Sequence, residues 1–240
     1  MQICPMPLLP FRPRVRPLHQ LGARRGAGQS ASRSPSRAAS RSATTSRQRS
    51  LSSASAEARA GRPRARCSVG GLIPHWAKDA RIAYKLIKAR AETLLEKNSY
   101  RSLVGSRRCL IVADGFYEWR VVTGGRKQPV RFSRIDEEPF AFAGLWPSWA
   151  DRESGELIES CTIITTRPNE LVAPVHDRMP VILPRDLERP WLDPEVEAQE
   201  AISLLQPYPA FLMKALPASS LVNSVRNDFP ALLEADAAAA

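Results

Sequence analysis

The stretch from Arg108 to Trp119 constrains the fold more than any other part of the sequence. Residues 109–113 are apolar and partly β-branched, a pattern typical of a buried β-strand. Asp114-Gly115 follows directly and predicts a bulge or a sharp bend, because glycine readily adopts positive φ. Beyond this bend Glu118 stands between two aromatic residues, so the predicted strand leads to a carboxylate that needs an explanation.

Two interpretations of Glu118 fit this stretch. A carboxylate packed against the rings of Tyr117 and Trp119 would lose its water and become suited to proton transfer near neutral pH. Alternatively, side chains alternate between the two faces of a strand, so Glu118 could simply point outward as a surface acid. On these residues alone, the surface interpretation is the simpler one.

The first 66 residues cannot build a hydrophobic core. They contain 14 Arg, no Lys and one Glu, a net charge of +13, and are rich in Ser, Ala and Pro with no apolar periodicity. We therefore predict a disordered tail over residues 1–66 and a folded domain over residues 67–240. Three origins of the tail fit its composition: an organellar presequence, a basic arm that holds phosphates loosely, or translation in a wrong frame or from a wrong start.

Charge, apolar runs and cysteine spacing argue against several classes of function. This part holds 21 basic and 23 acidic side chains, a net charge of −2, so a nucleic-acid site in it must be a local patch. The sequence has no run of eighteen apolar residues, so we expect no transmembrane helix and no membrane partner. The cysteines, at positions 4, 67, 109 and 161, form no C-x-x-C pair. This spacing argues against a zinc site and a disulfide framework, and we expect no metal and no cofactor.

Apolar patterning predicts a mixed, mostly antiparallel α+β domain. Strands in succession with helices inserted between them are typical of that class. The predicted strands cover residues 130–135, 140–145, 159–166, 181–183 and 211–216, and the predicted helices cover 82–100 and 194–205. The second helix is the clearer one, because Pro194 suits its first turn.

Two further residues are candidates for a functional site. His176 lies in a loop between Pro174 and Pro180, and a neutral imidazole there could exchange protons with Glu118. A histidine in such a loop is more often a structural hydrogen-bonding group, so both roles stay open. Trp76 follows a Pro-His turn and could serve as a stacking platform for a base.

Seven motifs in this order resemble the SRAP family, the SOS-response-associated peptidases or abasic-site-processing proteins. Together they span residues 70 to about 234 of the sequence. The motifs are Leu72–Asp79, Ala89–Thr93, Arg107–Trp119, Phe142–Trp146, Cys161–Thr166, Asn169–Leu183 and Val225–Asp228.

The resemblance implies both a fold and a chemistry. The implied fold is a compact α+β domain with a curved, barrel-like, mostly antiparallel sheet, flanking helices and a groove for single-stranded DNA. The implied chemistry is covalent capture of abasic sites in the DNA damage (SOS) response. A cysteine directly behind the initiator methionine condenses, through its α-amine and thiol, with the abasic-site aldehyde to a thiazolidine. An α-amine has a pKa of about 8 and is therefore partly neutral at pH 7, which makes this reaction reasonable.

The resemblance also implies roles for individual residues. By motif match, Glu118 is the acid that assists ring opening and Schiff-base formation, and His176 is its partner in proton transfer. Trp76, Arg90 and Arg178 match groove positions, where an aromatic ring stacks on a base and guanidinium groups hold phosphates.

The start of the chain departs from the family pattern. Residue 2 is Gln2, and residues 1–69 contain nothing that resembles the family's first segment, which carries the reactive cysteine and the first part of the sheet. Cys4 would need the removal of three residues to become N-terminal, and Cys67 would need cleavage after Arg66. We therefore expect little or no thiazolidine crosslinking from the chain as written, and enzymatic activity stays an open question.

A second departure lies in the expected site. Lys88 stands where the family has an active-site asparagine, and an ammonium group cannot reproduce the paired donor and acceptor of an amide. We expect Lys88 to pair with Glu118 or with a phosphate, which would favour the charged carboxylate and weaken it as a proton donor. The resemblance further implies that residues 89–93 line the site in extended form, against the helix that periodicity alone predicts.

Three hypotheses about function arise from these observations. The first is an SRAP-family protein that recognises single-stranded DNA with abasic sites, acting as a monomer in the bacterial cytoplasm in association with the nucleoid. The second is a member that only binds single-stranded DNA without reacting, with the basic tail adding phosphate contacts. The third is an organelle-targeted protein whose basic presequence is cleaved.

Overall fold

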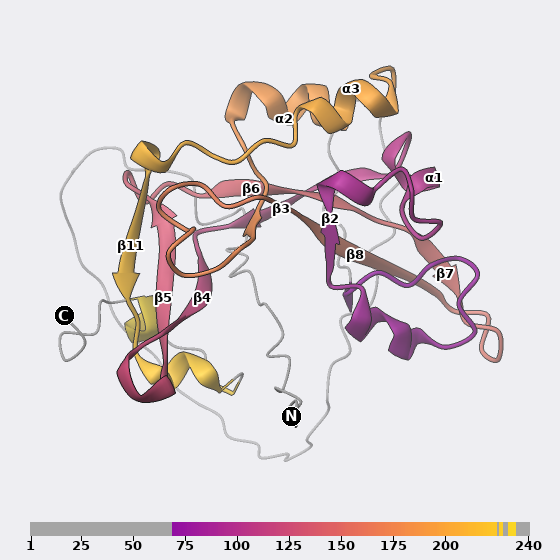
Figure 1. Cartoon of the computed structure of the whole chain (residues 1–240). Helices are drawn as coiled ribbons and strands as arrows, with labels where there is room; N and C mark the ends of the chain where they lie inside the picture. Colours follow the sequence, from indigo (N-terminus) through magenta and orange to yellow (C-terminus); the bar gives the residue numbers. More distant parts are fainter. Residues whose placement is uncertain (1–68, 225, 228–229, 234–240) are drawn as a thin grey trace, which may run out of the picture. The chain divides into compact units, whose positions relative to one another are not determined.

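Two β-sheets form the centre of the described part of the chain (Figure 1). The computed structural model describes residues 69–224, 226–227 and 230–233. The predicted tail over residues 1–66 lies outside these residues, and so does part of the motif at 225–228. The chain divides into two compact units, and every described residue lies in the same unit.

The larger sheet is organised around β8, its longest strand. β8 pairs in parallel with β1 and β2 and antiparallel with β6, β7 and β9, while β6 also pairs antiparallel with β3 and β10. The predicted mostly antiparallel arrangement is therefore confirmed. The strands of this sheet are β1 Val69–Gly70, β2 Lys88–Arg90, β3 Arg108–Ala113, β6 Phe140–Leu145, β7 Ser148–Ala150, β8 Leu157–Thr166, β9 Met179–Pro180 and β10 Ile182–Leu183.

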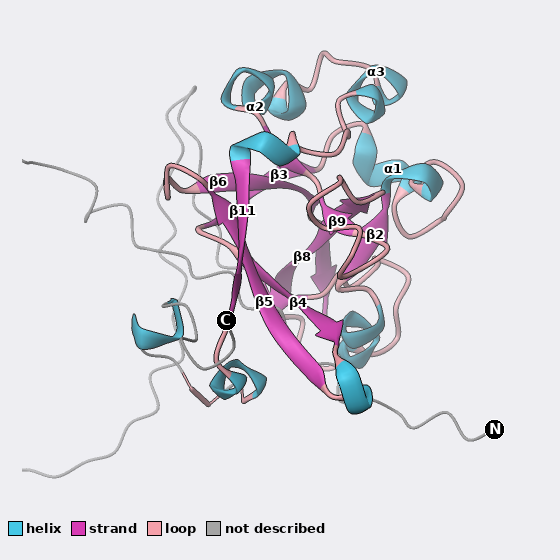
Figure 2. Ribbon diagram, turned by 60° about the vertical axis from the view of Figure 1, so that its left-hand side comes forward, coloured by secondary structure: helices cyan, strands magenta, loops and turns pink. Residues whose placement is uncertain are grey.

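The smaller sheet contains β4, Phe116–Val121, β5, Lys127–Arg134, and β11, Met213–Pro217. Its strands are antiparallel, in the order β11-β5-β4. The two sheets enclose a common apolar core in a barrel-like arrangement (Figure 2). The predicted α+β class with a sheet-dominated core is confirmed.

The bend at Asp114-Gly115 carries the chain from one sheet to the other, because β3 belongs to the larger sheet and β4 to the smaller one. The predicted bend is present, but its expected cause is wrong. Gly115 is not among the residues with positive φ. A Cβ atom at Gly115 would lie 2.9 Å from the carbonyl oxygen of Phe132 and 3.2 Å from Nε of Arg131. Glycine is needed here for close approach to β5.

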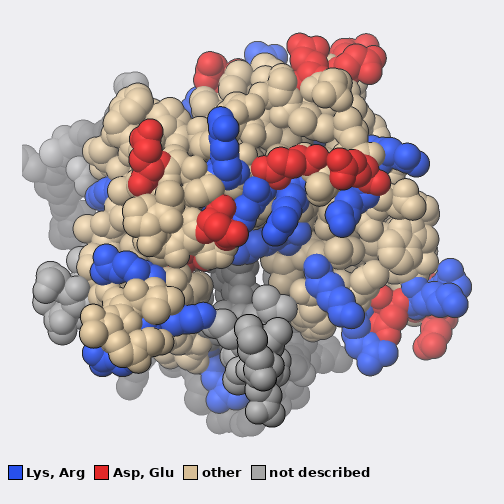
Figure 3. Space-filling view, viewed as in Figure 1, with Lys and Arg blue, Asp and Glu red and all other residues tan. Residues whose placement is uncertain are grey.

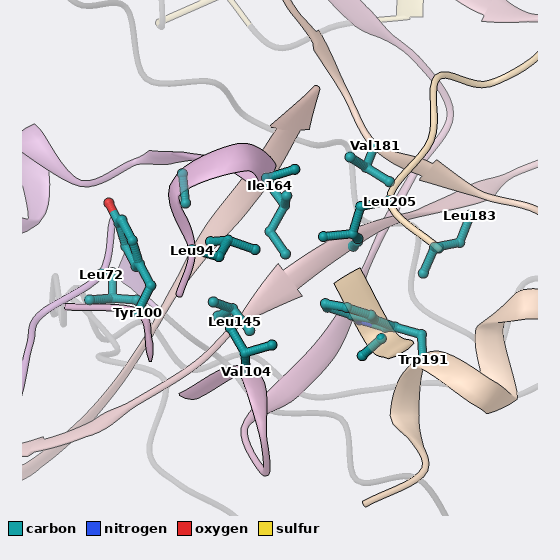
Figure 4. Close-up of a cluster of buried hydrophobic side chains, with 14 residues drawn as sticks. Leu72, Leu94, Tyr100, Val104, Leu145, Ile164, Val181, Leu183, Trp191 and Leu205 are labelled. Atoms are coloured by element: carbon teal, nitrogen blue, oxygen red, sulfur yellow. The ribbon is translucent and has the colours of Figure 1, made fainter. Parts of the chain in front are cut away.

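Two large apolar clusters lie on opposite faces of the larger sheet. One fills the space between the sheets, with Phe116 stacked on Phe132 at 5.1 Å between ring centroids. The other lies between the sheet and the helices, and Figure 4 draws its members. Neighbouring residues of β6 supply both clusters: Phe142 faces the smaller sheet and Ala143 faces the helices. Strand alternation therefore separates the two cores.

Three short α-helices cover the outer side of the larger sheet (Figure 1). They are α1, Arg101–Val104, α2, Arg185–Leu192, and α3, Ala198–Ser203. Trp191 of α2 is fully buried, and its indole N–H donates to the carbonyl of Cys109 at 3.0 Å. Among the described residues, no helix is long and apolar enough to span a bilayer.

A buried arginine joins these helices to the sheet. Arg108 donates from Nη1 to the carbonyl of Val104 and from Nε to that of Trp191, both at 2.6 Å, and from Nη2 to that of Val196 at 3.1 Å. Val104 and Trp191 lie in the last turns of α1 and α2, where backbone carbonyls have no partner within the helix. Arg108 supplies the hydrogen-bond donors for these two carbonyls. Only 7% of Arg108 is exposed, and this burial lowers the pKa of its guanidinium.

The predicted helix over residues 82–100 is wrong. The segment folds as a 3-10 helix at Ala80–Lys85, then β2, then a 3-10 turn at Ala91–Thr93. Its apolar residues, such as Leu94 and Ala89, do reach the core, but from an extended strand and a turn. Pairing of β2 with β8 outweighs the helical periodicity. The extended form that the resemblance implied for residues 89–93 is present at 89–90 and is wrong for Ala91–Thr93, which form the 3-10 turn.

Other boundaries differ from prediction in smaller ways. The predicted helix at 194–205 begins only at Ala198, and α2 escapes prediction because Pro190 interrupts its pattern. The predicted strands over 140–145 and 159–166 are confirmed as β6 and β8. β11 begins at Met213, after a 3-10 turn at Ala210–Leu212, and β5 extends three residues further toward its N-terminus than predicted. Further 3-10 turns lie at Thr123–Gly125, Ser220–Asn223 and Pro230–Leu233.

Candidate functional site

Glu118 points into the molecule from the middle of β4. The strand alternates in burial: Phe116 and Glu118 are buried, whereas Tyr117 and Trp119 lie on the other face. The interpretation of Glu118 as an outward surface acid is therefore wrong. Only 7% of the residue is exposed, and Val130 of β5 is its partner across the sheet. A carboxylate at this depth requires polar partners.

The flanking aromatic rings do not pack around this carboxylate, because the period of two that turns Glu118 inward turns them outward. The hydroxyl of Tyr117 donates to the carbonyl of Leu232 at 2.9 Å. The indole N–H of Trp119 donates to Oδ1 of Asn223 at 2.7 Å. Both aromatic residues thus hold segments near the C-terminus against β4, and the predicted ring-flanked acid is not what the strand forms.

Lys88 reaches Glu118 from the other sheet. Its Nζ lies 3.5 Å from Oε1 of Glu118, so the predicted pairing of the two residues is present. β2 alternates exposed, buried, exposed, and this places Lys88 and Arg90 on the same side of the strand. The Lys88 side chain is 48% exposed and that of Glu118 only 10%. The ion pair therefore joins a side chain at the surface to a buried carboxylate.

His176 is brought to the same carboxylate by the loop before β9. Its Nε2 lies 3.8 Å from Oε2 of Glu118. The backbone N–H of Arg178 donates to Nδ1 of His176 at 2.9 Å. Nδ1 also lies 3.1 Å from the carbonyl oxygen of Arg178, a contact in which the ring nitrogen would donate. The backbone of Arg178 thus holds the ring so that Nε2 faces Glu118. The exposed carboxylate of Asp177 lies 3.1 Å from Nδ1 and would support the ring when it is protonated.

Asn169 shapes the loop that carries His176. Its Oδ1 accepts from the backbone N–H groups of Leu171 and Val172, at 3.2 and 3.0 Å. Its Nδ2 donates to the carbonyl of Tyr208 at 2.7 Å. The carbonyl of Val172 then accepts from the backbone N–H of His176 at 3.0 Å. The sequence analysis named this position only as the first residue of a motif, although Asn side chains commonly shape turns in this way.

Arg178 is engaged by protein groups. It makes a bidentate pair with Glu92, Nη1 to Oε1 at 2.9 Å and Nη2 to Oε2 at 2.8 Å. Nη2 also donates to the carbonyl of Thr165 at 2.7 Å. The hydrogen bond from Arg178 holds the pKa of Glu92 below its ordinary range. Sequence reasoning missed Glu92 as a site residue, because a pairing between positions 86 apart in sequence leaves no local pattern.

Trp76 and Arg90, the other predicted groove residues, are both exposed, and 47% of Trp76 is accessible. The described contacts join neither of them to Glu118. Figure 3 shows Lys and Arg side chains gathered in the middle of one face, close to where β2 lies in Figure 1, with acidic side chains beside them. A basic patch of this kind is local, as the near-neutral charge of residues 67–240 requires.

The geometry thus assembles Lys88, Glu118 and His176 from three segments that are distant in sequence. The model of the SOS response associated peptidase (SRAP) family matches residues 20–225. The chain belongs to the SRAP family. The match confirms the resemblance that the seven motifs indicated.

Named relatives agree with this assignment. The chain is 52% identical over 165 residues to the abasic site processing protein YoqW of Bacillus subtilis, an alignment that covers 68% of this chain and 73% of that protein. It is 37% identical over 188 residues to the abasic site processing protein HMCES of Gallus gallus, covering 68% of this chain and 55% of that protein.

Solved structures support the fold of this SRAP-family chain. A crystal structure of a protein from Bacteroides thetaiotaomicron is 33% identical, with a TM-score of 0.64, and covers 70% of this chain and 75% of that one. A second, from Bordetella bronchiseptica, is 30% identical with a TM-score of 0.57 and covers 63% of this chain and 76% of that one. Within the described residues, no group of three or more His, Cys, Asp or Glu side chains is arranged to hold a metal ion.

Proposed function

We propose that this protein processes abasic sites in single-stranded DNA, with Glu118 and His176 as the groups that transfer protons. The observation that carries the proposal is the buried Glu118 carboxylate, with Lys88 3.5 Å from one oxygen and His176 3.8 Å from the other. Relatives that share about half of the aligned residues are named abasic site processing proteins, which supports the same role here.

The chemistry of an abasic site suits this group of residues. An abasic sugar opens to an aldehyde, and capture of an aldehyde by an amine requires an acid that protonates the departing oxygen and a base that accepts a proton from nitrogen. Glu118 provides a carboxylate enclosed by protein, and Nε2 of His176 lies 3.8 Å from one of its oxygens. The pair can therefore deliver and recover one proton at the same place.

We assign binding of the DNA strand to exposed side chains of the family motifs. Trp76 offers an accessible indole for stacking on a base, a contact that tolerates any sequence. Arg90 lies on the same side of β2 as Lys88 and is available to a phosphate. Arg178 contributes indirectly, because its contacts to Glu92 and Thr165 fix the loop two residues beyond His176.

One observation favours a second function, binding of single-stranded DNA without reaction. The ammonium group of Lys88 lies 3.5 Å from Glu118 and stands where the family has an asparagine, and it cannot supply the paired donor and acceptor of an amide. In this case the site would hold an abasic sugar through hydrogen bonds only. The two functions differ in one product: a covalent adduct that survives denaturation.

The test uses the full chain and a labelled single-stranded oligonucleotide with one abasic site, compared with the same strand intact and as a duplex. We expect tighter binding to the abasic single strand, measured by fluorescence anisotropy, with affinity that falls as salt rises. A denaturing gel then separates covalent from reversible binding, and the mass of any adduct identifies the bond. Absence of binding at low salt, or a preference for duplex, would contradict the proposal.

A pair of variants sharpens the assignment of the stacking residue. Trp76→Ala is expected to weaken binding of single strands by about 1–3 kcal/mol, the usual contribution of one stacked base. Tyr84→Ala is the matched control, because Tyr84 is an even more exposed aromatic residue close by in sequence, at 70%. Equal losses in the two variants would contradict a specific role of Trp76.

A further inference from the structure

We propose that Lys88 is itself a nucleophile, and that its amine forms a Schiff base with the aldehyde carbon of an abasic site. This inference rests on the proposed function, since it names the group that would react with the same substrate. It begins from the placement of Lys88, which stands at the edge of the site with its Nζ beside the buried Glu118.

The amine of Lys88 is accessible to a solute. About half of its side chain is exposed, at 48%, while the carboxylate that it contacts is almost enclosed, at 10%. β2 fixes the backbone of Lys88 through its parallel pairing with Ile163 of β8, so the amine is presented from a rigid strand. An aldehyde approaching from solvent would meet the amine first and the acid directly behind it.

The partners of Lys88 can move every proton that the reaction needs. Glu118 takes one proton from the ammonium group, and the free amine then adds to the aldehyde carbon, so a C–N bond forms as the C=O π bond breaks. The amine proton passes to oxygen and gives a carbinolamine. Glu118 returns its proton to the hydroxyl, which leaves as water, and a C=N bond forms. The net change is ammonium plus aldehyde to iminium plus water.

The product of this reaction would be stabilised where it forms. The iminium keeps the positive charge of the lysine, and Glu118 ends as a carboxylate beside it, at the distance that it now has from the ammonium group. His176 faces the other carboxylate oxygen with its Nε2 at 3.8 Å and is the group that would exchange protons with that oxygen during the addition. The same three groups thus serve the resting and the reacted states.

Another lysine of this chain illustrates what a purely structural pair looks like. Lys214 of β11 contacts Glu137, which Arg131 also contacts at 3.5 Å. The side chain of Glu137 is 49% exposed, and the hydrogen bond from Lys214 lowers its pKa below the ordinary range. Lys214 is thus a lysine in a partly exposed ion pair away from the buried acid, and it serves as an internal control for reactivity.

The experiment traps the imine by reduction. The full chain is incubated with a single-stranded oligonucleotide that carries one abasic site, with and without sodium borohydride, which converts the imine to a stable secondary amine. We expect an adduct on a denaturing gel that depends on borohydride, and a tryptic peptide containing Lys88 that carries the sugar remnant. Lys88→Arg keeps the positive charge and is expected to lose the adduct, while Lys214→Arg retains it.

The outcomes separate this inference from the function on which it rests. Binding of abasic single strands together with a trapped adduct on Lys88 supports both. Binding with an adduct on another amine, or with no trapped adduct, overturns the role of Lys88 and leaves the proposed function standing. Absence of binding overturns both. Thermal melts of Lys88→Arg confirm that it is folded, and the peptide map of the unmodified protein needs no variant.

Discussion

Two glutamates of this protein each contact a lysine and a second basic side chain, yet their surroundings differ. Glu118 lies inside, with Lys88 at 3.5 Å and His176 at 3.8 Å. Glu137 lies on a turn at φ 57°, half exposed, with Lys214 in direct contact and Arg131 at 3.5 Å. The basic partners of the buried Glu118 therefore lie farther away than Lys214 lies from the exposed Glu137.

Under the proposed function, this difference would distinguish an acid that transfers protons from an acid that only holds a turn in place. An exposed carboxylate between two permanent cations gains little stability from them, but it stays charged. A buried carboxylate with long contacts can gain or lose a proton without breaking a tight hydrogen-bond network, and an imidazole is the usual partner for that exchange. The comparison predicts that changes at Glu118 affect chemistry, whereas changes at Glu137 affect stability by a small amount.

The largest effect is expected from removing the carboxylate of Glu118. Glu118→Gln keeps the shape of the side chain but cannot transfer protons, so the rate of borohydride-trapped adduct formation should fall by at least about 100-fold. Glu137→Gln is the matched control and should leave that rate unchanged. The measurement is the initial rate on a denaturing gel with protein in excess. Equal rates for Glu118→Gln and the unmodified protein would remove the distinction between the two acids.

The next effect tests the bend that positions Glu118. Gly115→Ala places a Cβ 2.9 Å from the carbonyl oxygen of Phe132, so the backbone of β4 or β5 has to shift. We expect a loss of about 1–3 kcal/mol in the free energy of unfolding, measured with urea, and a slower adduct rate. Gly105→Ala is the control, because a Cβ there meets nothing within 4 Å. A silent Gly115→Ala variant would show that the close approach does not fix the strand.

Much of the fold could be predicted because single strands leave local patterns. β6 is an apolar run that coincides with the predicted strand at 140–145. β8 is rich in Ile and Thr, and it begins two residues before the predicted strand at 159–166. β2 could not be recognised from periodicity, since its three residues are held by parallel pairing to a strand more than 70 positions away. Helix α2 was hidden by Pro190, which a helix tolerates poorly away from its first turn. Tertiary pairing decided β2, and the burial of Trp191 holds α2 in place.

The sequence could indicate the residues of the candidate site, but it could not give their arrangement in space. The motifs singled out Glu118, His176 and Lys88, and the structure places these three side chains in contact. Strand alternation explains why Glu118 turns inward with Phe116. The pairing of Glu92 with Arg178 could not be anticipated, because it depends on how the turn after β2 meets the loop before β9. Pairings between residues that are far apart in sequence can be seen only in the structure.

A smaller effect is expected where an ion pair supports the site without belonging to the chemistry. Glu92→Gln removes the bidentate partner of Arg178, whose side chain is only 19% exposed. Since Glu92 itself is half exposed, we expect a loss of about 1 kcal/mol, a fall in Tm of roughly 2–4 °C. Hydrogen exchange in the loop carrying His176 should become faster. Glu96→Gln, an exposed acid in the same segment, is the control and should change neither quantity.

The smallest effect concerns pH and the exposed acid of the comparison. The hydrogen bond from Lys214 lowers the pKa of Glu137 from its ordinary value of 4.5, so the unfolded chain takes up this proton first as pH falls. The contribution of Glu137 to stability is therefore complete above about pH 4.5 and is lost as pH falls through the lower, folded pKa. We expect the unmodified protein to exceed Glu137→Gln by less than about 1 kcal/mol at pH 7, with the difference shrinking on acidification and in 1 M salt. Urea unfolding of both proteins at several pH values measures it. A difference that grows as pH falls would mean that the fold holds Glu137 in its protonated form. Glu137 would then not be the glutamate that stays charged, and its contrast with Glu118 would be wrong.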